Sequence, residues 1–302
     1  MSRISSFIKY AKRELPLIVH ANSINARYLD IPAKKNRVNV FQYHPERFGY
    51  RLYQNQPCNL GDSLGEVIIQ FLLGQKGIDI DKPISRTKHL YCVGTNIHGA
   101  YQSATVWGSG IYPPQNKKEE FFQKHCGRKL DIRAVRGPLT RQVVLKYGHK
   151  CPEVYGDPAI LLPLIYNPVV PKVRERLIIP QFIGEIRFRE SHPEEYMISM
   201  NTNDYKTVIN EILTSEIVYT SSLHGIILAE AYGVPAVFFR GLPKYKDFKY
   251  LDYYYSTGRT DVALTDSFED ALSVPVPPLP NLNKLKENLL GSFPYDLWEP
   301  ES

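Results

Sequence analysis

Short apolar runs alternate with helical patterns along most of the chain, and this alternation restricts its fold more than any other feature. Strands are predicted at residues 37–44, 89–94, 104–107, 131–135, 153–162, 176–182, 216–220 and 235–239. Helices are predicted at residues 5–13, 64–77, 136–148, 203–213, 225–233 and 283–293. Because strands that alternate with helices usually pair in parallel, the chain is expected to form parallel α/β sheets.

A proline-rich turn, NPVVPK at residues 167–172, divides this pattern into two halves. The chain has 302 residues, which is more than one hydrophobic core usually supports. We therefore predict an N-terminal α/β domain at residues 1–166, a C-terminal α/β domain at residues 167–280, and a C-terminal helix and tail at residues 281–302. Ligands of such sheets bind at the carboxyl ends of the strands, so a central cleft between the halves is expected to hold the site.

Composition excludes several classes of function. No run of 18 apolar residues exists and the basic N-terminal stretch interrupts any apolar segment, so neither a membrane-spanning helix nor a signal peptide is expected. The four cysteines show no CxxC spacing, which argues against zinc and thioredoxin-type chemistry and favours free thiols in a reducing cytoplasm. The net charge of +6 suits a chain that meets anions, or a surface that is merely rich in lysine. No basic run or RNA-binding motif indicates nucleic acid.

A histidine stands where a strand gives way to a helix, in the stretch TSSLHGIILAEAYGVP at residues 220–235. His224 is expected near a helix N-terminus, where free backbone N–H groups and the helix dipole favour an anion. Ser221 is expected to cap this helix, and Gly225 would let a ligand approach the backbone closely. The alternative is a core histidine that is hydrogen-bonded to a neighbouring carbonyl group.

Three further corners place polar groups or glycines after predicted strands. His98 follows the strand in VGTNIH, and Ser109 and Gly110 form a glycine turn in VWGSGI that could cradle a phosphate or carboxylate. Arg136 lies between a strand and a helix in RAVRGP, where its guanidinium could grip such a group with two hydrogen bonds. For the VWGSGI turn the alternative is a plain tight turn, and for Arg136 it is an arginine on the surface.

Acidic residues also occupy these corners. Asn59 and Asp62 lie on a loop before the predicted helix of residues 64–77, either as turn residues or as an acceptor site whose carboxylate is aimed at a substrate hydroxyl. Ser63 and Glu66 have the spacing of a capping box for the same helix. Asp157 is interpreted mainly as a residue that terminates its strand.

The ordered series NLGDSL, VGTNIH, VWGSGI, RAVRGPLT, YGDPAILLP and SSLHGIILAEAYGVP resembles the polysaccharide pyruvyl transferase family. The resemblance covers roughly residues 55–260, and the segment KDFKYLDYYYSTGR at residues 246–259 is also similar to family members. It implies two Rossmann-like domains in an arrangement like that of GT-B glycosyltransferases. It also implies an enzyme that transfers pyruvate from phosphoenolpyruvate to two hydroxyls of a sugar as a ketal, in bacterial-type surface polysaccharide biosynthesis.

The resemblance assigns the conserved donor-binding positions of the family to His98, Arg136 and His224. Many members read Arg-Leu-His-Gly where this chain has Ser222, and a serine cannot supply that positive charge. Either another cation replaces the arginine or donor binding is weakened. The sequence offers four substitutes without choosing among them: Arg187, Arg240, Lys244 and Arg259.

Phosphoenolpyruvate carries a phosphate and a carboxylate, so its site needs cations and N–H donors. A histidine suits general acid chemistry near neutral pH, and His224 is predicted to protonate the methylene carbon. Arg136, with His98, would hold the anionic groups, and Asp62 is the candidate base for the sugar hydroxyl. The full predicted donor site is His98, Ser109, Gly110, Arg136, Ser221, Ser222 and Gly225. The predicted acceptor site is Asn59, Asp62 and Tyr254. No metal and no cofactor is expected.

The acceptor is expected to be a sugar on a lipid-linked oligosaccharide, at the inner face of the cytoplasmic membrane. The basic stretch Arg3–Arg13 predicts contact with that membrane surface, or else an ordinary solvated helix. The segment Tyr245–Tyr255 would stack on sugar rings, touch the membrane or pack over the cleft. Two other functions stay open: a GT-B glycosyltransferase that uses a nucleotide sugar, and a non-catalytic protein that binds glycans or anions.

Overall fold

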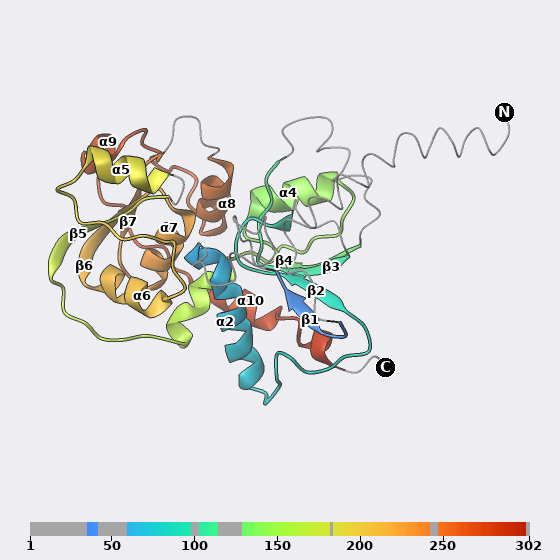
Figure 1. Ribbon diagram of the computed structural model, residues 1–302. Helices are drawn as coiled ribbons and strands as arrows, with labels where there is room; N and C mark the ends of the chain where they lie inside the picture. Colours follow the sequence, from blue (N-terminus) through green and yellow to red (C-terminus); the bar gives the residue numbers. More distant parts are fainter. Residues whose placement is uncertain are drawn as a thin grey trace.

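Two parallel sheets form the framework of the protein, one in each half of the chain (Figure 1). The computed structural model describes residues 35–41, 59–97, 103–113, 129–181, 184–241 and 247–299. The predicted helix at residues 5–13, His98 and Lys244 lie outside these residues. The mixed α/β fold with parallel sheets that the sequence predicts is confirmed.

The first sheet has the strand order β1-β2-β3-β4, with all neighbours parallel. Its strands are β1 (Val38–Val40), β2 (Lys88–Tyr91), β3 (Ala104–Trp107) and β4 (Leu130–Ala134). Helix α2 (Leu60–Gly74) connects β1 to β2, and helix α4 (Pro138–Lys146) follows β4 with proline in its first turn. Proline is well placed there because the first N–H groups of a helix lack intrahelical partners.

The second sheet has the parallel order β5-β6-β7. Its strands are β5 (Arg174–Ile179), β6 (Ser215–Thr220) and β7 (Ala236–Phe238), and its helices are α5 (Glu185–Ser191), α6 (Tyr205–Leu213), α7 (Leu223–Ala231), α8 (Phe248–Ser256) and α9 (Phe268–Leu272). Helix α7 is buried on nearly every side, because it lies between the second sheet and the short helical segment Pro158–Leu164 of the first half.

The strand predicted at residues 153–162 is wrong. Tyr155 makes a single bridge to Val135, and residues Pro158–Leu164 form a 3-10 helix, η2. The side chain of Asp157 accepts a hydrogen bond from the backbone N–H of Ala159 and so caps this helix. Proline at the start of η2 favours a helical turn and cannot donate to a strand ladder. The apolar run is therefore buried as a helix instead of a strand.

The capping box predicted at Ser63 is also wrong, because α2 begins at Leu60 with Asn59 as its N-cap residue. The backbone N–H of Leu60 donates to the carbonyl of Met200, 2.7 Å away, and Asn59 bridges Asn201. These bonds to the second half of the chain fix where the helix starts. The hydroxyl of Ser63 donates to the carbonyl of Leu60 inside the first turn.

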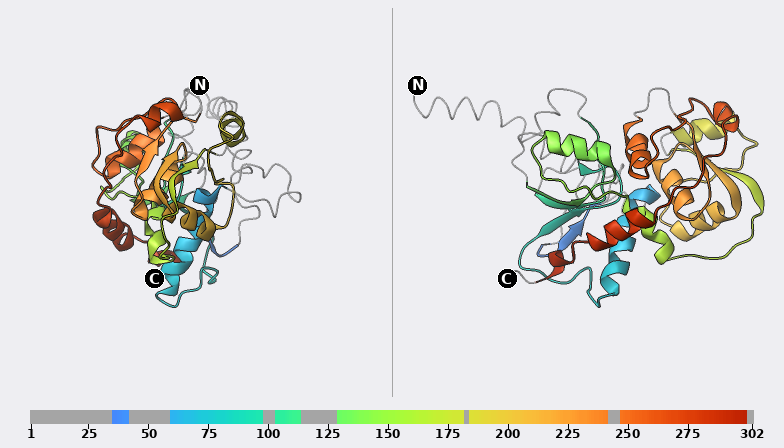
Figure 2. Two further views of the ribbon diagram at one scale, coloured as in Figure 1. Left: turned by 90° about the vertical axis from the view of Figure 1, so that its left-hand side faces the viewer. Right: turned by 180° about the vertical axis from the view of Figure 1, so that it is seen from behind.

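The C-terminal segment returns to the first half of the chain (Figure 2). It contains α10 (Asn283–Gly291) and the 3-10 helix η4 (Tyr295–Trp298). The indole N–H of Trp107 donates to Leu289 and that of Trp298 donates to Ile80, each at 3.0 Å. One hydrophobic core runs through both halves and includes this segment. The domain boundaries at residues 166 and 280, and a GT-B-like arrangement, stay predictions. None of the described helices is long and apolar enough to cross a membrane.

Candidate functional site

Helix α7 brings His224 into the interior, one turn from the carboxyl end of β6. The hydroxyl of Ser222 accepts a hydrogen bond from the N–H of Gly225, so Ser222 caps α7 and the cap predicted at Ser221 is wrong. Ser221 instead accepts a hydrogen bond from the N–H of Gln181 at 2.7 Å and links the ends of β6 and β5. His224 is only 5% exposed, as its place in the first turn of a buried helix requires.

Asp157 faces the imidazole of His224. Oδ2 of Asp157 lies 3.6 Å from Nε2 of His224, which is too long for a hydrogen bond but close for an ion pair. Both atoms are buried and have no hydrogen-bond partner among the described residues. The other carboxylate oxygen of Asp157 caps η2, so the position of this carboxylate is fixed by the backbone. A protonated His224 would be stabilised by this fixed negative charge.

Gly61 gives the ring of His224 its space. A Cβ atom added at Gly61 would lie 1.8 Å from Nδ1 of His224, so any larger residue would displace the imidazole. Because Gly61 lies in the first turn of α2, the N-terminal ends of α2 and α7 meet at this ring. The predicted proton donor and the predicted acceptor segment therefore share one site.

Asp62 lies in the same first turn of α2 and is 7% exposed. Burial raises the pKa of Asp62 to about 6, while the nearby His224, the hydrogen bond from Asn59 and the charge of Lys249 act in the opposite direction. The amide Nδ2 of Asn59 donates to Oδ2 of Asp62 at 3.0 Å. A carboxylate with a pKa of about 6 is a better proton acceptor at neutral pH than an ordinary aspartate and is still ionised there.

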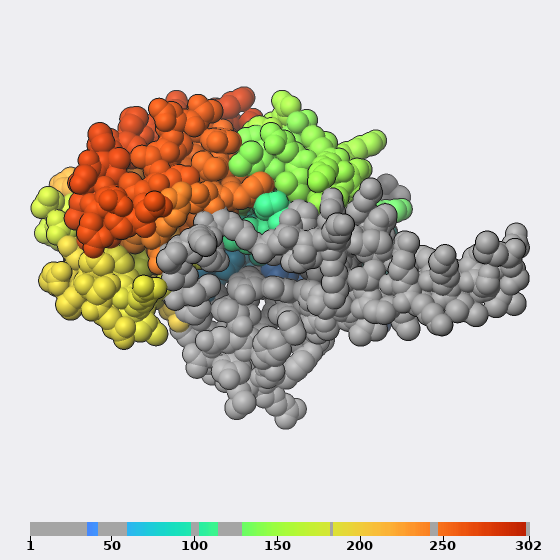
Figure 3. Space-filling view, turned by 90° about the horizontal axis from the view of Figure 1, so that it is seen from above, coloured from blue at the N-terminus to red at the C-terminus, as the bar shows by residue number. Residues whose placement is uncertain are grey.

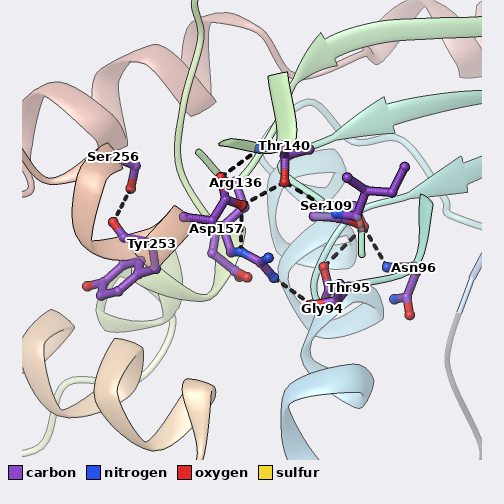
Figure 4. A network of polar contacts seen from close by, with 12 residues as sticks. Gly94, Thr95, Asn96, Ser109, Arg136, Thr140, Asp157, Tyr253 and Ser256 are labelled. Atoms are coloured by element: carbon purple, nitrogen blue, oxygen red, sulfur yellow. Dashed lines mark hydrogen bonds and ion pairs between the residues drawn. The ribbon is translucent and has the colours of Figure 1, made fainter. Parts of the chain in front are cut away.

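Arg136 is fully buried at the turn between β4 and α4 (Figure 4). Its Nε atom donates to Oδ2 of Asp252 at 3.1 Å, and Nη1 donates to the hydroxyl of Thr95 at 2.6 Å. Its Nη2 atom is buried with no hydrogen-bond partner in the described parts of the chain. Since buried guanidinium donors are normally satisfied, this atom indicates a place where an anionic ligand could bind.

Asp252 fixes the arginine from helix α8, far away in the sequence. It also accepts hydrogen bonds from the N–H and the hydroxyl of Thr140, at 2.8 and 2.6 Å. A Cβ atom at Gly137 would lie 1.9 Å from the carbonyl oxygen of Asp252, so the glycine of the RGP sequence permits α8 to approach. Helices α4 and α8 consequently pack against each other, and Figure 3 shows the green and orange parts of the chain in contact.

Lys249 also points into this interior from α8, three residues before Asp252, and is 8% exposed. Burial, together with the positive charge of Arg136, lowers the pKa of Lys249 to about 7, and Asp62 acts in the opposite direction. The site therefore combines Arg136, His224 and Lys249 with three carboxylates, Asp62, Asp157 and Asp252.

The family model described as polysaccharide pyruvyl transferase matches residues 59–241, which hold most of these groups. The chain belongs to the polysaccharide pyruvyl transferase family. A relative from Acanthamoeba polyphaga mimivirus, "Uncharacterized protein L143", is 24% identical over 201 residues, 63% of this chain and 67% of that protein. A solved structure from Klebsiella pneumoniae, described as a functional uncharacterized protein KP1_0663, matches with a TM-score of 0.51 and 14% identity. It covers 84% of this chain and 98% of that one, and it supports the fold alone.

In this member of the polysaccharide pyruvyl transferase family, the glycine turn of residues 108–111 makes its contacts with other parts of the protein. The hydroxyl of Ser109 is buried and donates to the carbonyl of Gly94 at 3.1 Å. Gly110 packs against the guanidinium of Arg136, because a Cβ atom there would lie 2.3 Å from its Cζ. Gly225 packs against Thr220 in a similar way, where a Cβ atom would lie 2.3 Å from the hydroxyl oxygen. These residues shape the site, and their contact with a donor stays a prediction.

Of the four substitute cations predicted for the missing arginine, the three that the structure describes are already paired or are exposed. Arg240 forms ion pairs with Asp247 and Asp266, and Arg259 makes two bonds to the buried Glu230. Arg187 is exposed on α5. Tyr254, a predicted acceptor residue, is buried under Arg259, whose guanidinium carbon lies 4.7 Å from its ring centre. No cluster of metal-ligating side chains occurs in the described ranges.

Sequence reasoning missed Lys249, Asp252 and Gly61, and it treated Asp157 as structural. One signal was available for the first two: Lys249 and Asp252 are three residues apart in a segment that resembles the family, and residues three apart share a helix face. No sequence signal places that face against Arg136, because the contact spans 116 residues.

Proposed function

We propose that this protein transfers a pyruvyl group from phosphoenolpyruvate to two hydroxyls of one sugar, forming a ketal. One observation carries the proposal: a fully buried arginine with an unused donor, Nη2 of Arg136, shares a site with a histidine and a carboxylate suited to proton transfer. Family membership supports a transferase that acts on polysaccharide. The donor and the ketal chemistry are inferred from the charges in the site.

The donor carries a phosphate and a carboxylate on one small carbon skeleton. Nη2 of Arg136 would donate to one of these groups, and the N–H groups at the start of α7 would favour the other. Asp252 and Thr95 hold the guanidinium in a fixed orientation before the donor arrives. Preorganised donors of this kind stabilise charge without reorganising during the reaction.

Ketal formation needs one proton at carbon and the removal of a proton from each attacking hydroxyl. His224 would protonate the methylene carbon, with Asp157 stabilising the imidazolium that gives up the proton. Asp62 would take the proton of the first hydroxyl as its oxygen bonds to the central carbon. The second hydroxyl then attacks, phosphate leaves with that proton, and return of the proton from Asp62 to His224 restores the site.

The acceptor is proposed to be a sugar of a lipid-linked oligosaccharide that is reached at the cytoplasmic membrane surface. The net charge of +6 supports contact with an anionic surface. Asn59 and Asp62 lie at the end of α2 where such a sugar would have to approach His224.

The test is incubation of the whole chain with phosphoenolpyruvate and a panel of aryl and lipid-linked galactosides, glucosides and mannosaminides. Phosphate release that depends on a sugar, together with the mass of a pyruvyl ketal on it, is the expected result. Thermal shift with phosphoenolpyruvate, UDP-sugars and GDP-sugars is the companion measurement. Stabilisation by a nucleotide sugar alone would overturn the proposal in favour of a glycosyltransferase.

A further inference from the structure

Lys249 is the one buried, positively charged residue of the described site that has no role in the donor binding and proton transfers proposed so far. Its helix is fixed at two points. The hydroxyl of Tyr250 donates to the carbonyl of Ser221 at the corner between β6 and α7, and Asp252 holds Arg136 at the corner between β4 and α4. Lys249 therefore lies within one turn of α8 from both contacts, near the corners that supply His224 and Arg136.

The charges around Lys249 come from three separate elements. Arg136 at the β4–α4 turn repels its ammonium group, and Asp62 on α2 attracts it. His224 on α7 and Asp157 before η2 act on Asp62, and Asp252 on α8 is engaged by Arg136. The Nζ atom lies 4.8 Å from the ring centre of Tyr250, on its own helix. Without a donor, burial and Arg136 therefore oppose the positive charge of Lys249, and the carboxylate of Asp62 favours it.

We propose that Lys249 contacts the phosphate or carboxylate of the donor as an ammonium group, and that it acquires its proton as the donor binds. This inference rests on the proposed function. A ligand with at least two negative charges beside Arg136 replaces repulsion by attraction, and it therefore favours the charged lysine. Ser222 on α7 is neutral, so in the described site the positive charge for a dianionic donor would come from Arg136 and from Lys249 once it is protonated.

Proton uptake separates this role from simple packing. At pH 8 an amine whose pKa is about 7 is mostly neutral, and the phosphate of the donor is already fully ionised. Calorimetry of phosphoenolpyruvate binding in two buffers of different ionisation enthalpy is expected to show uptake approaching about one proton per donor. The dissociation constant of the unaltered protein should also rise by up to about tenfold per pH unit between pH 7.5 and 9.

Two variants test whether Lys249 is the group that takes up this proton. Lys249→Met is expected to lose the uptake and to weaken donor binding by at least about tenfold. Lys249→Arg keeps a permanent charge, so it should bind the donor more tightly than Lys249→Met while taking up no proton. The control is Lys284→Met, on the exposed face of α10, which should match the unaltered protein in both respects.

The outcomes separate this inference from the proposed function. Failure of the unaltered protein to bind phosphoenolpyruvate overturns both. Donor binding with the same proton uptake in Lys249→Met or Lys249→Arg overturns the inference alone and assigns the proton to another group. Should Lys249→Met fail to fold, the Lys249→Arg variant and the pH dependence of the unaltered protein still decide the matter, and a dissociation constant that is flat above pH 7.5 overturns it.

Discussion

Nε2 of His224 lies 3.6 Å from Oδ2 of Asp157, and neither of these buried atoms has a hydrogen-bond partner in the described chain. The carboxylate is fixed by η2 and the imidazole by α7, two elements that pack directly on each other. Small movements of either side chain would bring the pair to hydrogen-bonding distance. Under the proposed function, Asp157 would be a positioning residue that stabilises the charged form of His224.

Asp157→Asn is expected to lower kcat by about 10²-fold or more, because asparagine keeps the cap on η2 but supplies no negative charge to an imidazolium. The Michaelis constant for phosphoenolpyruvate should change much less. Steady-state kinetics with thermal unfolding as a folding control measures both. A kcat equal to that of the unaltered protein would remove Asp157 from the mechanism.

Gly61→Ala is expected to abolish transfer and to lower stability. The added Cβ would lie 1.8 Å from Nδ1 of His224, so the imidazole must leave the position in which its Nε2 faces Asp157. Gly74→Ala, near the end of the same helix, is the matched control, since a Cβ there meets nothing within 4 Å. The control should keep full activity and gain about 0.5–1 kcal/mol of stability. Equal activity in the two variants would contradict the placement of His224.

Periodicity and turn residues were sufficient to predict the framework from the sequence. All seven described strands overlap predicted runs, because strand alternation and the residues that end each strand are local signals. The error at residues 153–162 has a local cause as well: Asp157 and Pro158 start a helical turn within an apolar run that is short enough to suit either structure. The start of α2 was misplaced because bonds to Met200 and Asn201 in the other half determine it.

The candidate site was predictable only where its residues follow strands. Arg136 and His224 stand at such corners, and parallel sheets bring corners together. Lys249 and Asp252 lie inside a helix, so their part in the site depends on the packing of α8 against α4. Gly61 has no side chain that could suggest chemistry, and its role is visible only from the ring beside it.

Arg136→Ala is expected to lower the free energy of unfolding by about 3–5 kcal/mol, because it leaves the buried carboxylate of Asp252 without its cation. Loss of transfer in this variant would therefore not distinguish an unfolded protein from one that has lost donor binding. The double variant Arg136→Met/Asp252→Asn removes both charges and should recover most of the stability, as measured by urea unfolding. Donor binding by calorimetry should stay absent in the double variant. Donor affinity at the level of the unaltered protein would show that Arg136 has no role in binding.

Asp62→Asn is expected to remove the acidic limb of the pH–rate profile. A base must be ionised to accept the hydroxyl proton, so kcat/KM of the unaltered protein should rise as the pH increases through about 6, the pKa to which burial raises this carboxyl. Asparagine keeps the hydrogen-bonding shape next to Asn59 but cannot take a proton, so activity should fall by about 10²–10⁴-fold at pH 7.5 and lose that rise. Profiles between pH 5 and 9 with a saturating sugar acceptor measure this effect. The matched control is Asp79→Asn on the exposed loop after α2, which should leave the limb in place. An unchanged limb in Asp62→Asn would assign the base to a different group in the site.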